Sequence, residues 1–385
     1  MNSLQQGTVA LLKSAITGQP QPLPEDFDLA EAYPQLNRHH MVTLLCEGAA
    51  VCGLKRQQEL FLGYLRVLQA SEAQNRQLQR VFAALEEAGI DYMPLKGCNM
   101  KPLYPKPELR IMGDADVLIR MEQYERIVPI MESLGFAFGL ESDHELPWQH
   151  KDLYIELHKR IIPSYNKDLY GYYGDGWKFA ECRAGHRYGM TPEDETVFLF
   201  THFAKHFRDG GIGCRHVLDL WVWQRSHPEV DMTYVRGEIE KLQLLEFYDN
   251  IRRLLAVWFE GASSDELTDY ITDFVFDSGS WGKLEIRTAS VGVRDSGHGR
   301  KNGWVRLRYV LRTLFPSAKD LEVKYTVLKK APWLLPLVWI YRPFYKLFAE
   351  PRSLRVHKRH WKALQDDQLT ARQKALRYVG LDYRF

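Results

Sequence analysis

The feature that most constrains the fold is the order of short strand-like and helical segments between residues 88 and 165. Residues 90–95 (IDYMPL), 114–119 (DADVLI) and 150–160 (HKDLYIELHKR) are short and rich in strand-forming residues. A short helical piece, CNMKPLY, separates the first two, and MEQYERIVPIMESLGF, which Pro129 would kink or shorten, separates the next two. This order of strand, helix, strand, helix, strand predicts a compact unit built on a small mixed sheet.

Helical periodicity dominates on both sides of this unit. It is clearest over 55–88, which ends at Gly89, and it returns at Thr191, a capping residue followed by Pro192 and acidic residues. We therefore expect an α+β protein. Its regions would be an N-terminal helical region (1–89), the α/β core (90–165), a helical domain that lines the cleft (166–280) and a basic, aromatic-rich helical C-terminal region (281–385).

Targeting and disulfide signals are weak. The five cysteines are scattered without CxxC spacing, which indicates neither a disulfide framework nor a zinc ribbon. The N-terminus has no basic leader followed by a long apolar stretch. The most apolar stretch, APWLLPLVWIY (331–341), has two prolines and about half of the ~20 apolar residues of a membrane span. We expect a cytoplasmic protein with no transmembrane segment.

Charge is distributed unevenly along the chain. Residues 281–385 hold 23 Lys and Arg against 8 Asp and Glu, whereas the rest of the chain is acidic. This asymmetry indicates an anionic partner, either RNA or a membrane surface, or else two parts that neutralise each other by packing together. The aromatic and basic segment PWLLPLVWIYRPFYKLF has three possible roles. It could be an interfacial helix at a membrane, an RNA-stacking surface or a helix that docks between domains.

Three carboxylates are candidates for a metal site. Successive side chains of a strand alternate between faces, so Asp114 and Asp116 point the same way, about 6.6–7 Å apart along the backbone. In the third strand, Tyr154, Glu156 and His158 share one face. If the two strands are neighbours, Glu156 joins the aspartates. Three such carboxylates can hold two Mg²⁺ ions, as in phosphoryl transfer.

A turn and two cations would complete a phosphate site. Gly97 follows a strand and precedes a helix, where backbone N–H groups can approach a phosphate closely. Lys96 and Arg110 lie near the same edge and suit the charge of a triphosphate. Each signal is weak alone, because DxD pairs and Lys-Gly turns are common, but together and in this order they are more specific.

Histidines and charged residues further along are candidates for the wall of the cleft. His202 and His206 in HFAKH lie four residues apart on one helix face and lack the glutamate of a zinc-protease HExxH motif. We favour a polar helix face over a metal site, with His202, His206, Arg215 and Asp219 contacting nucleotide or acceptor. His158 would orient Glu156, meet substrate or be satisfied in the core.

The order of these segments resembles the polymerase-β-like nucleotidyltransferase superfamily. In that superfamily a strand, a glycine turn and a helix precede a strand with two aspartates and a later strand with one acid. More narrowly, PLKGCNMKPLY, ELRIMGDADVLI and IELHKR are similar to the bacterial family called uncharacterised nucleotidyltransferases. The similarity extends to TPEDETVFLFTHFAKHF, GCRHVLDL and LFPSAKDLEVKYTVLKKAPWLLPLVWIYRP, and so covers most of the chain.

The resemblance implies transfer of a nucleotidyl group from an NTP, with two Mg²⁺ ions and release of pyrophosphate. Asp114 and Asp116 would bind the metals, Glu156 would be the third acid, and Gly97 the glycine of the phosphate turn. The chain departs from the pattern at Lys96, where a Gly-Ser or Gly-Gly turn is usual, and in using Glu rather than Asp as the third acid.

Some choices remain open at this stage. The acceptor could be a small molecule, a protein side chain or an RNA end. The alternatives to an active enzyme are a catalytically silent nucleotide-binding relative and an interaction protein recruited to RNA or membrane by its basic C-terminal third.

Overall fold

The structure, a computed structural model, describes residues 1–55, 58–279, 282–296, 307, 309–311, 313–321, 325–349 and 359–382. The chain divides into two compact units. One is formed by Met1–His206 and Ile212–Trp281 and the other by Phe207–Gly211 and Gly282–Tyr383. The expected α+β class is confirmed, and the finer division into four regions stays a prediction.

The first unit is built on a mixed sheet of seven strands in the order β3-β4-β5-β2-β1-β7-β6. β2 runs antiparallel to β1 and parallel to β5, and β4 runs antiparallel to β5. The strands are β1 (Tyr92–Pro94), β2 (Ala115–Ile119), β3 (Ala137–Phe138), β4 (Glu145–Gln149), β5 (Tyr154–His158), β6 (Glu181–Ala184) and β7 (Arg187–Gly189). The sequence predicts β1, β2 and β5 and misses the other four.

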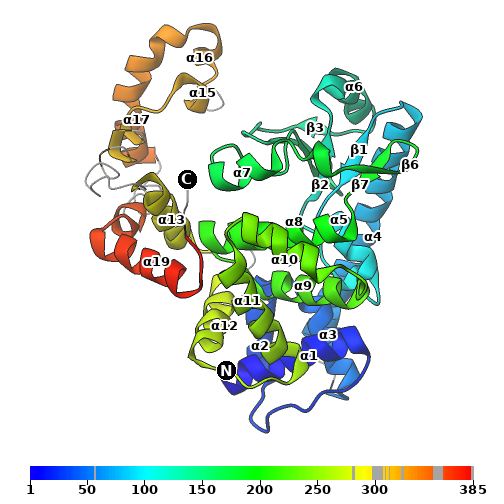
Figure 1. Cartoon of the computed structure of the whole chain (residues 1–385). Helices are drawn as coiled ribbons and strands as arrows, with labels where there is room; N and C mark the ends of the chain where they lie inside the picture. Colours follow the sequence, from blue (N-terminus) through cyan, green and yellow to red (C-terminus); the bar gives the residue numbers. More distant parts are fainter. Residues whose placement is uncertain are drawn as a thin grey trace. The chain divides into compact units, whose positions relative to one another are not determined.

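One face of this sheet is apolar and covered by helices α4 (Gln58–Glu87) and α6 (Tyr124–Ser133) (Figure 1). Alternation along β2 and β5 turns Val117 and Leu157 to this face, where they pack with Val81 of α4 and Ile127 of α6. The opposite face is left for the polar side chains of the same strands. Short helical turns connect the strands: α5 (Gly97–Met100), η1 (Lys101–Leu103), η2 (Pro107–Leu109) and η3 (Met121–Gln123).

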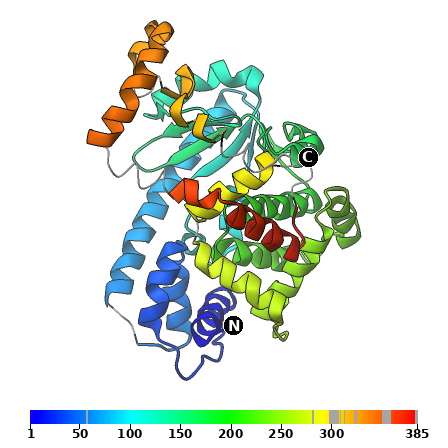
Figure 2. The same ribbon diagram turned by 90° about the vertical axis from the view of Figure 1, so that its left-hand side faces the viewer.

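Helices α1 (Ser3–Thr17), α2 (Leu29–Arg38) and α3 (Val42–Val51) form the N-terminal part of the unit. Asn2 caps α1 through a reciprocal capping box, and the Asp28 side chain caps α2. The 30-residue α4 packs against α3 at one end and against α6 at the other, so it runs from these helices to the sheet (Figure 2).

Further helices follow the sheet in the first unit. The Thr191 hydroxyl accepts a hydrogen bond from the Asp194 N–H at 3.1 Å, which confirms the predicted cap of α8. These helices are α7 (Lys167–Tyr173), η4 (Trp177–Phe179), α8 (Pro192–Asp209), α9 (Cys214–Ser226), α10 (Met232–Lys241), α11 (Leu245–Leu255) with the π-turn Ala256–Glu260, and α12 (Glu266–Ser278).

The second unit is helical where it is described. Its elements are α13 (Leu284–Ser296), α15 (Ala318–Leu321), α16 (Val327–Lys330), η6 (Pro332–Leu334), α17 (Leu335–Ala349) and α19 (Asp366–Tyr378). Two small cores lie within it, one centred on Val293 and Leu369 and the other on Leu328 and Val338. Among the described residues of the whole chain, no helix combines the length and apolarity required to cross a membrane.

Candidate metal centre

The polar face of the sheet gathers acidic side chains from three strands. In the parallel pairing of β2 with β5, Asp116 lies opposite Glu156. In the antiparallel pairing of β5 with β4, His158 lies opposite Glu145. Residues opposite each other in neighbouring strands share a face, so these four side chains lie together. Asp114 immediately precedes β2, which begins at Ala115.

Asp116 is the most deeply buried of these carboxylates, at 5% exposure. Its Oδ1 accepts a hydrogen bond from Lys96 Nζ at 2.7 Å and one from His158 Nε2 at 2.8 Å. The imidazole Nε2 must be the donor, because an ionised carboxylate only accepts. Burial alone would raise the pKa of Asp116, but the Lys96 ammonium and the His158 hydrogen bond hold it well below its usual range.

The pKa values of Glu156 and Asp114 are shifted in the opposite direction to that of Asp116. Burial, followed by the charges of Asp114, Glu145 and Asp116, raises the pKa of Glu156 to about 8. Burial and the charge of Asp116 likewise raise the pKa of Asp114. Negative charge therefore exceeds nearby positive charge at this face. A divalent cation bound by carboxylate oxygens would relieve that excess, and Mg²⁺ prefers such ligands.

The donor atoms lie close enough for a metal. One oxygen each of Asp116 and Glu156 and one nitrogen of His158 all lie within 4.8 Å of one another. Asp114 is outside this group of three, although its charge affects both neighbouring carboxyls. The sequence reasoning puts Glu156 and His158 on one face of their strand and joins them to the aspartates only on condition that the strands are neighbours; the structure adds the parallel pairing that brings Glu156 to Asp116.

The turn between β1 and α5 has an unusual backbone. Lys96 has φ 47° and ψ −109°, a conformation that favours glycine, and the Leu95 carbonyl accepts a hydrogen bond from the Cys98 N–H at 3.0 Å. Holding a lysine there costs about 1–3 kcal/mol. Its ammonium lies 2.7 Å from Asp116 Oδ1. Gly97 lies against Arg110: a Cβ at position 97 would be 2.8 Å from Nη1 of Arg110, so that side chain would have to shift to accommodate any larger residue.

Arg110 lies behind this turn in a buried ion pair. Its Nε and Nη2 donate to the two carboxylate oxygens of Asp219 at 3.2 and 2.9 Å, and Tyr104 Oη donates to the same carboxylate at 2.7 Å. Arg215 Nη1 donates to the Ile111 carbonyl at 3.0 Å. Arg110 and Asp219 therefore contact each other, and their predicted contacts with phosphate and nucleotide stay predictions.

The predicted histidine pair on α8 is formed. Nε2 of His206 lies 2.9 Å from Nε2 of His202, so one imidazole donates and the other accepts. Burial lowers the pKa of both well below the usual value, and the charge of Lys96 contributes in the same direction. Both rings are therefore neutral at pH 7, and both lie close enough to Lys96 for its charge to lower their pKa values. Their contact with nucleotide or acceptor stays a prediction.

Two residues of the polar face, His144 and Glu145, are absent from the sequence prediction. Nε2 of His144 lies 2.7 Å from Oε1 of Glu145. Their strand, β4, could have been found from the alternation of Leu146 and Trp148, which are buried, with Glu145 and Gln149. Pro147 within the segment obscures this pattern, since proline is depleted in strands.

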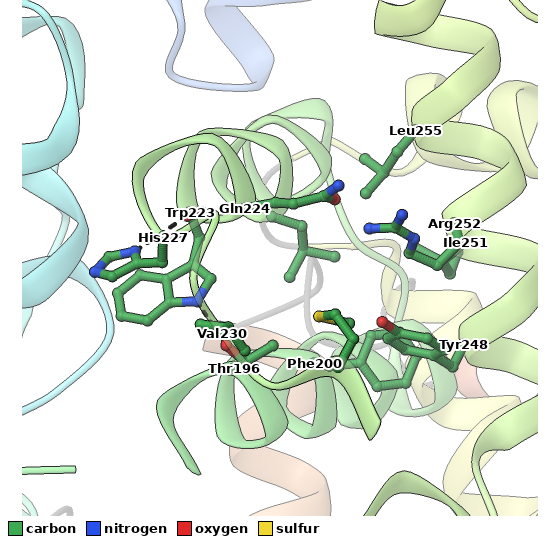
Figure 3. Close-up of a pocket in the computed structure, with 12 residues that line it drawn as sticks. Thr196, Phe200, Trp223, Gln224, His227, Val230, Tyr248, Ile251, Arg252 and Leu255 are labelled. Atoms are coloured by element: carbon green, nitrogen blue, oxygen red, sulfur yellow. Dashed lines mark hydrogen bonds between the residues drawn. The ribbon is translucent and has the colours of Figure 1, made fainter. Parts of the chain in front are cut away.

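A separate pocket lies between α8, α9, α10 and α11 (Figure 3). Its lining is mainly apolar and includes Phe200, Trp223 and Leu255. Trp223 Nε1 donates a hydrogen bond to Thr196 Oγ1 at 2.8 Å at its edge. None of the predicted site residues lines this pocket, so it is distinct from the carboxylate face.

Comparison with known proteins identifies a family for this chain. A family model described as uncharacterised nucleotidyltransferase matches residues 25–260, more than half of the chain, including the whole sheet. No curated protein and no solved structure matches the chain. The chain therefore belongs to the family of uncharacterised nucleotidyltransferases.

Proposed function

We propose that this member of the family catalyses Mg²⁺-dependent transfer of a nucleotidyl group from an NTP to an acceptor hydroxyl, with release of pyrophosphate. The observation that supports this most directly is the pairing of Asp116 with Glu156 on neighbouring parallel strands, beside Asp114. Excess negative charge and the carboxylate oxygens of Asp116 and Glu156 suit Mg²⁺.

The carboxylates would have two roles in this reaction, metal binding and acceptance of a proton. Asp114 and Asp116, with Glu156, would hold Mg²⁺, which when bound neutralises charge on the phosphates. The acceptor oxygen forms a bond to the α-phosphorus, and the bond from that phosphorus to the bridging oxygen breaks, so that pyrophosphate leaves. Glu156 would accept the hydroxyl proton, because bound Mg²⁺ would offset the neighbouring negative charges and keep this carboxyl ionised beside the acceptor.

The experiment that tests this proposal is incubation with each of the four radiolabelled NTPs, Mg²⁺ and a fractionated cell extract. We expect label to reach an acceptor only with Mg²⁺, and Asp114→Asn to remove the transfer. Absence of transfer from every NTP, with nucleotide binding unaffected by Mg²⁺, would reject the enzyme. Mg²⁺-dependent binding without transfer would favour the catalytically silent relative.

A second candidate role, recruitment to an anionic membrane surface, is favoured by an exposed apolar stripe on η6 and α17. Trp333, Leu337, Ile340 and Tyr341 are 76%, 62%, 65% and 53% exposed and share one helix face. The region that contains them has the excess of Lys and Arg noted above. Aromatic and basic residues together suit a surface of acidic lipids.

Vesicle co-sedimentation of the full chain tests this role. We expect binding to vesicles with phosphatidylserine, weaker binding at high salt, and little binding to neutral vesicles. Ile340→Glu should reduce binding, whereas Leu140→Glu, at a residue 72% exposed outside the stripe, should not. Equal binding by both variants would contradict the membrane role, and binding to RNA but to no vesicle would favour an RNA partner.

A further inference from the structure

The polar face of the sheet extends one strand beyond the proposed Mg²⁺ centre, to β4. We propose that His144, Glu145 and His158 form a second metal site, specific for a borderline divalent ion such as Zn²⁺. This site does not depend on the proposed transfer reaction, although His158 also contacts Asp116 of the carboxylate centre.

The backbone brings these three donors together. Glu145 and His158 are opposite each other in the antiparallel β4–β5 pairing, so their side chains project from one face. His144 directly precedes β4, and its ring centroid lies 5.7 Å from that of His158 in an edge-to-face arrangement. One donor atom of each residue lies within 4.8 Å of the other two.

Small side-chain rotations would bring one donor atom of each of these three residues to bonding distance of one ion. Two ligands of a tetrahedral zinc, at about 2.0–2.2 Å from the metal, lie roughly 3.3–3.5 Å apart. Nε2 of His144 and Oε1 of Glu145 are already 2.7 Å apart. Because the donors come from adjacent residues and from a directly paired strand, the backbone needs no rearrangement.

The two imidazoles each have an unsatisfied nitrogen. His144 is 8% exposed and His158 fully buried, and Nδ1 of each has no hydrogen-bond partner among the described residues. A buried polar atom is almost always paired with protein, water or an ion. Nδ1 of His158 is thus unexplained by the protein alone, whereas His144 contacts Glu145 through its other nitrogen, Nε2.

The remaining contacts of His158 match those of a metal ligand. A ligating histidine usually donates its other ring N–H to a carboxylate, which fixes the tautomer and leaves a lone pair for the metal. His158 donates from Nε2 to Asp116, so its Nδ1 holds the lone pair. Asp116 would therefore orient this histidine.

The chemistry of the donors separates this site from the carboxylate centre. Imidazole nitrogens with one carboxylate bind Zn²⁺, whereas Mg²⁺ takes oxygen ligands and retains water. Two neighbouring sites on one sheet would then select different ions. Glu145 supplies the only formal negative charge within the trio.

Titration of the chelator-treated full-length protein with Co²⁺, which reports nitrogen ligation in its visible spectrum, tests the site. We expect one Co²⁺ to bind, one Zn²⁺ to displace it and millimolar Mg²⁺ to leave it in place. His144→Ala should weaken Co²⁺ binding by about a hundredfold or more, beyond the effect of losing an outer partner. His150→Ala, a matched control at a histidine that directly follows the other end of β4, should bind as the unchanged protein does.

Two further variants make the outcome decisive. Asp114→Asn should keep the Co²⁺ site while losing Mg²⁺-dependent transfer, so failure of the transfer reaction alone leaves this inference standing. If His144→Ala does not fold, Glu145→Gln replaces it and should weaken binding in the same way. Unchanged Co²⁺ affinity in His144→Ala or Glu145→Gln, or loss of the site in Asp114→Asn, would overturn the proposal.

Discussion

Replacing Glu156 by glutamine is expected to lower the rate of nucleotidyl transfer by about a hundredfold to ten-thousandfold, the contribution typical of a positioned general base. The same change should stabilise the metal-free protein, by on the order of 1–3 kcal/mol at pH 8. The reason is that the half-buried Glu156 lies among Asp114, Glu145 and Asp116, whose charges oppose its ionisation. Glutamine keeps the shape and removes that repulsion.

The two effects are measured separately. Initial rates of label transfer report the loss of activity, and thermal unfolding in chelator reports stability. Glu125→Gln, at an exposed residue of α6 on the other side of the sheet, is the control and should change neither. A Glu156→Gln variant that keeps more than a tenth of the activity would contradict the assigned role, and one that is less stable would contradict the charge argument.

Replacing Arg110 by alanine is expected to lower the free energy of unfolding by about 3–5 kcal/mol, because it leaves Asp219 buried and uncompensated. Arg110 makes a two-point contact with Asp219, and the side chains are only 7% and 10% exposed. Chemical denaturation of the two proteins measures the difference. Arg236→Ala is the matched control: its ion pair with Asp249 is exposed and should contribute at most about 1 kcal/mol.

A double variant separates structure from phosphate binding at Arg110. Arg110→Met combined with Asp219→Leu removes both charges and should recover part of the lost stability, since the buried Tyr104 hydroxyl loses its acceptor. If Arg110 also contacts phosphate, this stable variant will have a raised KM for the NTP. A stability loss in Arg110→Ala no larger than that in Arg236→Ala would show that the pair is unimportant for folding.

The order of segments and the alternation of side chains were sufficient to predict the α+β class and the shared face of Glu156 and His158 within one strand. Alternation is a local property of a strand, so it can be read from sequence. The pairing of β2 with β5 is not local, and the sequence reasoning could only state it as a condition. β4 was missed because Pro147 and charged neighbours obscure its pattern, and Glu145 was missed with it.

Arg110 shows a different limit of sequence reasoning. A cation near a glycine turn suggests a phosphate ligand, but a carboxylate more than a hundred residues away can also neutralise it. Asp219 does so here, across a distance in sequence that no local pattern spans. The turn itself was predicted, whereas the crowding of Gly97 by Arg110 depends on this tertiary contact.

The ion pair between Lys96 and Asp116 would make binding of the proposed Mg²⁺ at this carboxylate an exchange instead of an addition. The ammonium already lies 2.7 Å from Asp116, held there by a turn whose backbone favours glycine. An ion that took the same oxygen of Asp116 would compete with the ammonium, so its apparent affinity would be multiplied by the fraction of molecules in which the lysine has left. The side chain at position 96 would then set the metal concentration at which the proposed site fills, without any change in the carboxylates.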